Sequence, residues 1–107
     1  MIKAVFYKKN GLFIGFDVSG HANYAKSGKD IVCAAVSSAV MLSTNLITDG
    51  FGIKAKAAAK DDKISLRCGG DEKSNAVIAS LVEHLGHILL EYKGTISIII
   101  KEEKNHA

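Results

Sequence analysis

The chain has 107 residues, which is enough for one domain with a modest core. Its hydrophobic fraction of 48% is ordinary for a globular protein, and its unbroken apolar runs fall far short of the roughly 20 residues that span a bilayer, so no membrane partner is expected. The net charge of +3 comes from scattered lysines with acidic residues among them, and without a dense basic stripe direct nucleic-acid binding is not expected.

The first twenty residues predict a β-hairpin. Residues 2–8 and 12–19 alternate as half-buried strands do, and Asn10-Gly11 between them is a strong signal for a tight turn. The apolar positions of the second strand are expected on one face, namely Leu12, Ile14, Phe16 and Val18.

A loop is predicted after this hairpin. Residues 20–29 contain Gly20, Gly28 and several small polar residues. A connection of ten residues is longer than most, and long loops are often lids or binding loops. Both glycines are expected to supply backbone conformations that the loop needs.

The first predicted helix runs from Ile31 to about Asp49, with Asp30 as its N-cap. Small and apolar side chains occur on nearly every side of this helix. Such a helix is usually buried on more than one side. We therefore expect it to pack on a sheet and also on another helix or a second subunit, which favours a homodimer.

A second hairpin follows the glycines at positions 50 and 52, which end the helix. Its strands are predicted at residues 52–59 and 63–68, with Asp61-Asp62 at the turn. Cys68 shares the inward face of its strand with Ile64 and Leu66. We expect this cysteine to be structural, because free cysteines are often buried as small hydrophobic residues.

The last two predicted elements are an amphipathic helix over residues 73–92 and a strand over residues 95–101, separated by Gly94. The apolar positions of the helix are Ile78, Leu81, Val82, Leu85, Leu89 and Tyr92, and its polar positions are Ser80, Glu83, His84, His87 and Glu91.

The predicted order is ββαββαβ, which favours an α+β two-layer domain with a five-stranded mixed sheet and two helices. This single domain is expected over residues 1–102, with a polar tail at 103–107. The N-terminus lacks the pattern of a signal peptide, and two cysteines do not make a disulfide framework. A cytoplasmic location is therefore expected.

The candidate site pairs Cys33 with His21. Cys33 is predicted in the first turn of the helix, where free N–H groups and the helix dipole favour the thiolate, which is the nucleophilic form. His21 lies twelve residues earlier, and the loop is long enough to bring its imidazole beside the thiol as general base and acid. From its position alone, Cys33 is equally well explained as one more small residue of a buried helix.

Other residues are candidates for supporting roles. Asp30 is interpreted first as the helix cap, and second as a carboxylate that orients His21. Ser37 lies one helical turn after Cys33, where it either touches the site or satisfies a backbone carbonyl.

No metal or organic cofactor is expected. His84 and His87 are spaced i,i+3 on a polar helix face, which indicates solvated side chains, since no third ligand is apparent. The sequence contains neither a CxxC motif nor a phosphate-binding or dinucleotide-binding glycine pattern.

Two sequence blocks carry a family resemblance. They are Gly20-His21-Ala22 and Gly28-Lys29-Asp30-Ile31-Val32-Cys33-Ala34-Ala35-Val36-Ser37. With the ββαββαβ order, they closely resemble the ribosomal-processing cysteine protease family, Prp.

The resemblance implies a dimeric cysteine endopeptidase without a cofactor. Family members remove a short N-terminal extension from the large-subunit ribosomal protein L-twenty-seven. The catalytic pair of the family corresponds to Cys33 as nucleophile and His21 as base, and residues 22–29 correspond to a flexible cover of the active site. The supporting positions of the motif correspond to Asp30 and Ser37.

Two other functions fit the residues. A thiol redox or peroxide-sensing protein would use the same reactive cysteine, but no resolving partner is evident. A non-enzymatic, ribosome-associated dimeric module would use the mildly basic surface instead.

Overall fold

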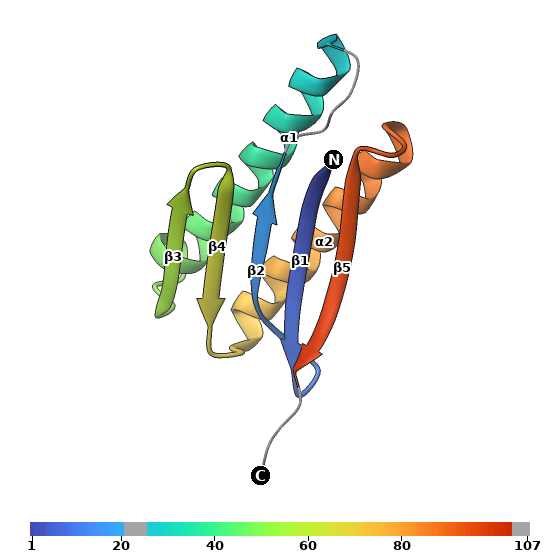
Figure 1. The fold of residues 1–107 in the computed structure, drawn as a ribbon. Coiled ribbons are helices and arrows are strands. Elements are labelled where there is room, and N and C mark those ends of the chain that lie inside the picture. The colour runs from blue at the N-terminus through green and yellow to red at the C-terminus, as the bar shows by residue number, and fades with distance from the viewer. Residues whose placement is uncertain (21–25, 104–107) are drawn as a thin grey trace.

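The computed structural model describes residues 1–20 and 26–103, and for residues 26–30 it describes the backbone alone. The elements in chain order are β1 (Ile2–Lys9), β2 (Leu12–Ser19), α1 (Lys26–Asn45), the π-helical turn η1 (Leu46–Gly50), β3 (Ala55–Lys60), β4 (Lys63–Cys68), α2 (Glu72–Glu91) and β5 (Ile96–Glu103). Figure 1 shows these elements along the chain.

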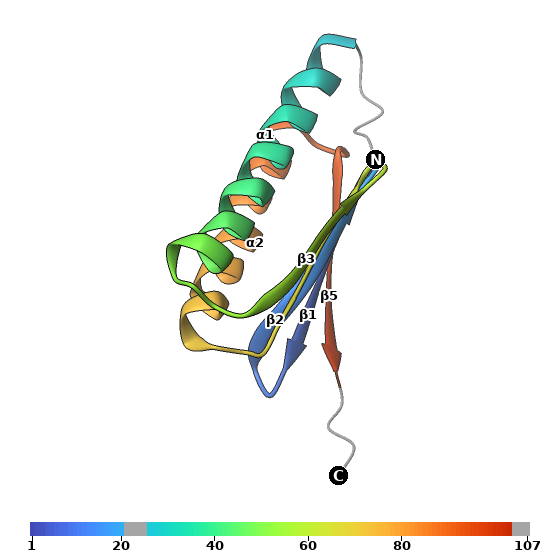
Figure 2. The same ribbon diagram turned by 90° about the vertical axis from the view of Figure 1, so that its left-hand side faces the viewer.

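The five strands form one mixed sheet in the order β3-β4-β2-β1-β5. β1 and β5 are parallel, and the other three neighbouring pairs are antiparallel. Both helices lie on the same face of the sheet, and the other face is open (Figures 1 and 2). The predicted two-layer α+β fold and its ββαββαβ order are confirmed.

The turn between β1 and β2 has the backbone that its sequence predicts. Asn10 and Gly11 have φ values of 53° and 79°, and this pair of positive angles matches the twist of a two-residue hairpin. Of the four apolar positions predicted on one face of β2, Phe16 and Val18 are buried in the core, whereas Leu12 and Ile14 are not. The pairing register shifts after Tyr7, and the resulting bulge turns Phe13, rather than Ile14, into the core.

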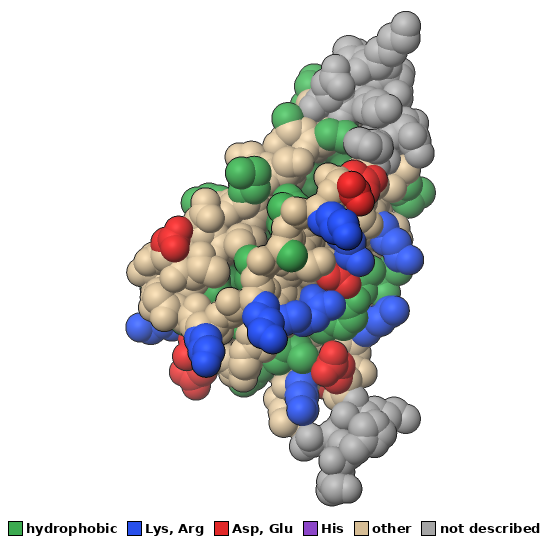
Figure 3. Space-filling model, turned by 60° about the vertical axis from the view of Figure 1, so that its left-hand side comes forward, with side chains coloured by type: hydrophobic (Ala, Val, Ile, Leu, Met, Phe, Trp, Pro, Cys, Tyr) green, Lys and Arg blue, Asp and Glu red, His purple; other side chains and the backbone are tan. Residues whose placement is uncertain are grey.

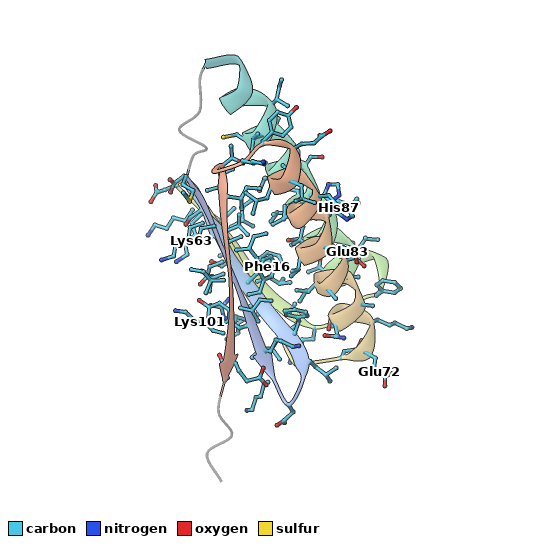
Figure 4. The ribbon with its side chains drawn as sticks, turned by 90° about the vertical axis from the view of Figure 1, so that its right-hand side faces the viewer. Phe16, Lys63, Glu72, Glu83, His87 and Lys101 are labelled. Carbon is cyan, nitrogen blue, oxygen red and sulfur yellow. The ribbon has the colours of Figure 1, made fainter. Side chains whose placement is uncertain are left out.

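The core lies between the sheet and the helices. Phe6 and Phe16 are fully buried at its centre, with their ring centroids 6.0 Å apart. Figure 4 shows Phe16 pointing from the sheet toward the helix layer. Val32, Val36 and Val40 meet this centre from α1, because they recur at helical spacing along one face.

The start of α1 differs from the prediction. The helix begins at Lys26, so residues 26–29 are not a loop and Asp30 is not an N-cap. Gly28 likewise lies in helical backbone, not in the loop conformation expected of it. The far end agrees with the predicted length, because the chain continues from α1 through η1 to Gly50, and Gly52 then takes a positive φ of 63°.

The outer side of α1 remains apolar and exposed. Met41 and Leu42 are 56% and 62% exposed, and Leu46 and Phe51 continue the same surface. By length and composition, Ile31–Gly50 is apolar enough to cross a membrane, which the short unbroken runs of the sequence did not suggest. In this fold Val32, Val36, Val40 and Ile47 of this segment pack in the hydrophobic core.

The second half of the chain follows the sequence closely. Asp71 caps α2, since its carboxylate accepts from the backbone N–H groups of Lys73 and Ser74 at 2.7 and 3.3 Å. The predicted polar face of α2 is exposed, and the predicted apolar positions line the core or pack against it. β5 continues through Glu103, one residue beyond the expected domain boundary.

An ion pair holds three residues together on the open face of the sheet. The Arg67 guanidinium lies 3.1 Å from Asp17 Oδ2 and 4.3 Å from the centre of the Tyr7 ring, and the Tyr7 hydroxyl donates to Asp17 at 2.8 Å. Burial works to raise the pKa of Asp17, but hydrogen bonds from Arg67, Ser65 and Tyr7 outweigh it and lower the pKa to about 2.

This cluster predicts an acid-sensitive contribution to stability. The folded-state pKa of Asp17 lies below its ordinary value of 3.8, so its contribution is present above that value and is lost as the pH falls toward about 2. We expect the free energy of unfolding, measured in urea, to fall across this window. In Asp17→Asn the fall should be smaller, and an equal fall in both proteins would contradict this assignment.

Candidate active site

Cys33 lies on the side of α1 that faces the end of the sheet. It is half-buried and packs against the hydrophobic core. Its thiol is not part of a disulfide. Val32 beside it is fully buried, so the helix is anchored in the core at this residue.

Cys33 opens onto a cavity of about 390 Å³. Three parts of the chain enclose it: the inner face of α1, the adjoining ends of β1 and β2, and the turn between β3 and β4. The lining residues are Ile2, Val18, Ser19, Gly20, Cys33, Val36, Ser37, Val40, Ala59, Asp61, Asp62, Lys63 and Ile64. A half-buried thiol on the wall of a mostly apolar cavity is accessible to a peptide and partly shielded from water.

The predicted partner of Cys33, His21, lies outside the described residues. Its chain neighbour Gly20 lines the same cavity as Cys33. Residues 22–25 and the side chain of Asp30 also lie outside the described part, so the predicted cover of the site and the carboxylate role of Asp30 stay predictions.

Ser37 is placed as the sequence suggested. It is exposed and lines the cavity one helical turn beyond Cys33. By contrast, Ser43 and Thr44 further along α1 use their hydroxyls to donate to the carbonyls of Ala39 and Val40. The position of Ser37 on the cavity wall is thus established, and its two predicted roles, contact with the site and satisfaction of a backbone carbonyl, stay predictions.

The helix start changes the expected origin of thiolate stabilisation. Because α1 begins at Lys26, Cys33 lies about two turns inside the helix and not in its first turn. The field of the helix terminus falls off within one turn, and an amide in the helix interior donates to the carbonyl four residues earlier. In this conformation the N–H of Cys33 is not free to hold an oxyanion, and the helix terminus is too distant to favour the thiolate.

Sequence reasoning missed the turn between β3 and β4 as part of the site. The sequence predicted an ordinary hairpin turn at Asp61-Asp62 and a strand from Lys63, and Asp61 indeed has a positive φ of 57°. The strand order brings this turn beside the end of β2 and opposite Cys33. No local pattern carries that information, since it depends on which strands become neighbours.

Cys68 is separate from this site, as predicted. Its thiol donates to the carbonyl of Ile14 at 3.5 Å, and it lies at the opposite end of β4 from Lys63. The five residue steps from one end to the other span roughly 17 Å of strand. The two cysteines are therefore too far apart to form a disulfide in this fold.

A larger groove of about 700 Å³ lies between α1 and α2, on the outer side of the helix layer. Apolar residues of both helices and Phe51 line it, together with Lys73 and His84. Neither Cys33 nor Gly20 borders it. We place the chemistry in the smaller cavity because a nucleophile lines it.

Gly20 is required by the backbone beside the site. Its φ is +90°, and a Cβ built on it would lie 2.8 Å from the carbonyl oxygen of Met1. We predict that Gly20→Ala lowers the free energy of unfolding by at least about 1–2 kcal/mol, because a left-handed backbone disfavours any side chain.

Thermal or urea denaturation measures this effect, with Gly86→Ala as the matched control. Gly86 lies inside α2 with nothing near its virtual Cβ, so its replacement should be neutral or slightly stabilising. An undiminished stability of Gly20→Ala would show that the chain at this edge of the cavity is free to rearrange.

Known proteins match both the sequence and the fold. The family model described as "Cysteine protease Prp" matches residues 1–97. The chain is 26% identical over 93 residues to the ribosomal processing cysteine protease Prp of Bacillus subtilis (strain 168), covering 79% of this chain and 83% of that protein.

Solved structures show the same fold at low identity. The essential ribosomal processing protease Prp from S. aureus, in complex with a covalently linked product peptide, superposes with a TM-score of 0.84 at 23% identity, covering 94% of this chain and 100% of that one. The protein SMU.848 from Streptococcus mutans superposes with a TM-score of 0.80 at 22% identity, covering 96% of each chain.

Proposed function

Because the chain belongs to the cysteine protease Prp family, whose model matches residues 1–97, we propose that it removes the N-terminal extension of the large-subunit ribosomal protein L-twenty-seven. Cys33 is the nucleophile of the proposed reaction, and His21 is its general base and acid. The observation that carries this proposal is the shared cavity: the thiol-bearing Cys33 and the residue before His21 line the same space.

The proposed chemistry is acyl transfer through a thioester. His21 takes the proton of the Cys33 thiol, and the thiolate attacks the scissile carbonyl carbon to give a tetrahedral oxyanion. When this intermediate collapses, the C–N bond breaks and His21 gives its proton to the departing amine. Water, deprotonated by His21, then hydrolyses the thioester and releases the N-terminal peptide from Cys33.

The cavity wall suits an apolar segment on the acyl side of the cut. Apolar residues from both layers line it, namely Ile2, Val18, Val36, Val40 and Ile64. The resemblance to the Prp family implies an extension that is apolar and contains Phe. Its apolar side chains would be buried in this cavity, which would hold the scissile bond beside Cys33. Burying one large apolar side chain contributes about 1.5–3 kcal/mol to binding before ordering costs.

The test is the conversion of the purified L-twenty-seven precursor, followed by the mass of the product and its N-terminal residue. We expect one cut that leaves the mature protein intact, and we expect the already processed protein to be inert. Peroxide consumption that requires Cys33, without cleavage of the precursor, would instead support a thiol redox protein. The separation of Cys33 from Cys68 disfavours that alternative, because no second thiol can resolve a sulfenic acid.

We also propose that the enzyme acts as a cytoplasmic homodimer. The apolar outer side of α1 supports a second copy as its cover, since Met41, Leu42 and Phe51 are about half exposed in the single chain. Analytical ultracentrifugation is expected to give twice the mass of the chain. A monomer at all concentrations would contradict the proposal, and a Leu42→Asp variant should shift the mass toward the monomer.

A further inference from the structure

The open face of the sheet gathers cationic side chains from four strands. Cross-strand pairing places them in two rows that run across the sheet. One row is Lys60, Lys63, Ser19, Lys3 and Ser97, and the other is Lys56, Arg67, Gly15, Tyr7 and Lys101. We call the six cations of these rows the basic face. All six are exposed, and Figure 4 shows Lys63 and Lys101 pointing away from the helices.

This face has nearly one sign of charge. It holds six of the 14 Lys and Arg residues, but between its rows lies only one of the 11 Asp and Glu residues, Asp17, which Arg67 neutralises. Beyond the second row, Lys9 and Glu103 add one charge of each sign. Figure 3 shows Lys and Arg side chains gathered over the strands.

Solvation of an open sheet does not account for this arrangement. Mixed charges keep a sheet face soluble, and lysines that prevent edge-to-edge pairing belong on edge strands. Here Lys3 lies on β1, and Lys63 and Arg67 lie on β4, which are two of the three central strands of the sheet. Rows of positive charges on central strands create a positive electrostatic potential, which favours the binding of an extended anion.

The shape of the face fits a phosphate backbone. The two rows are four residues apart along each strand, which is roughly 13 Å, and neighbouring strands are about 4.8 Å apart. The residues between the cations include Gly15, Ser19 and Ser65, whose small side chains would not block a backbone that lies across the sheet. The ring of Tyr7 is covered by Arg67 and does not offer a platform for base stacking.

We propose that the basic face binds the phosphate backbone of RNA without reading its sequence. Contacts to phosphates position a protein on nucleic acid but carry no base specificity. An anionic membrane fits less well, because Val5 is buried and Ile99 is half-buried between the rows, so no apolar side chain projects for insertion. The choice of RNA among nucleic acids rests on the proposed function, since the proposed substrate is a ribosomal protein and ribosomal proteins assemble with RNA.

The proposed site meets the catalytic cavity at the first row, where Ser19 and Lys63 also line that cavity, whereas the other five cations do not line it. Asp61 and Asp62 line that cavity with Cys33, on the helix side of the sheet, whereas the basic face covers the opposite side. RNA on the open face would therefore hold the protein near its substrate without filling the cavity. The sequence did not suggest this surface, because the six cations are spread over 99 positions and only the strand pairing brings them together.

The test is the binding of a labelled single-stranded RNA, followed by fluorescence anisotropy over a series of salt concentrations. A triple variant, Lys3→Gln with Lys56→Gln and Lys101→Gln, removes one cation from each of β1, β3 and β5. We expect it to weaken binding at least about tenfold at low salt. The slope of log K against log salt should fall in magnitude by about 2, because each lost phosphate contact removes about 0.7.

The matched control carries the same loss of charge elsewhere: Lys54→Gln with Lys73→Gln and Lys93→Gln. These lysines are exposed and lie outside the basic face. We expect the control to bind RNA nearly as well as the wild type. No RNA binding by the wild type, equal weakening in both triple variants, or preferential binding to anionic phospholipid vesicles would overturn the proposal.

Cleavage of the precursor in the absence of RNA separates this proposal from the proposed function. The first triple variant should cleave at the wild-type rate, since none of its three residues lines the cavity. Failure of RNA binding with cleavage intact would refute the basic face alone. Failure of cleavage with RNA binding intact would refute the protease assignment and leave the basic face standing.

Discussion

Replacing Cys33 with alanine is expected to lower the rate of precursor cleavage by at least about 10⁴-fold, with the fold unchanged. Loss of the nucleophile in covalent proteases removes most of the catalytic rate enhancement, because no other group can form the acyl intermediate. Cys33 is only half-buried, so the shorter side chain leaves the core residues around Val32 and Val36 in place. Initial rates on the precursor measure this effect.

Cys68→Ala is the matched control for this variant. Cys68 is also half-buried and also packs against the core, but it lies at the other end of β4 from the cavity. We expect it to cleave at close to the wild-type rate with a small loss of thermal stability. Circular dichroism and a melting curve for both variants separate a catalytic effect from unfolding.

Replacing His21 with alanine is expected to lower kcat by about 10²–10⁴-fold, which is the typical contribution of a general acid and base. The position of Cys33 inside α1 makes this effect larger than the sequence suggested, because the helix terminus is too distant to favour the thiolate. The pH dependence gives a second measurement. The residual rate of His21→Ala should rise with hydroxide concentration, without the acidic limb that an imidazole base gives the wild type.

His87→Ala is the control for loss of a histidine. His87 is exposed on α2 and borders neither cavity. Its replacement should leave both kcat and the pH profile unchanged. A wild-type pH profile in His21→Ala would show that another group takes the thiol proton.

Local signals predicted the elements of this fold well. Asn10-Gly11 requires positive φ at both residues, and alternating apolar residues around such a turn specify a hairpin wherever they occur. The amphipathic spacing of residues 73–92 predicted α2 in the same local way, whereas its cap, Asp71, came only from the structure. The sequence placed Cys33 on this helix but in its first turn, whereas the structure places it further along α1, on the wall of the cavity.

The features that sequence reasoning missed depend on pairing between distant segments. The bulge that exchanges Ile14 for Phe13 arises from the register of β1 against β2, and the alternation of residues 12–19 gives no sign of it. Asp61 and Asp62 reach the site only because β4 pairs with β2. Asp30 is a good capping residue, but the helix continues four residues before it, because capping preference is a weak constraint on a helix start.

The most direct test of the account is the mass of the enzyme during a single turnover. Equal amounts of enzyme and L-twenty-seven precursor are mixed, quenched in acid and digested for mass spectrometry. We expect a transient adduct with the mass of the N-terminal extension, joined as a thioester to the peptide that contains Cys33. An adduct on any other residue, or complete processing of the precursor by Cys33→Ala, would contradict it.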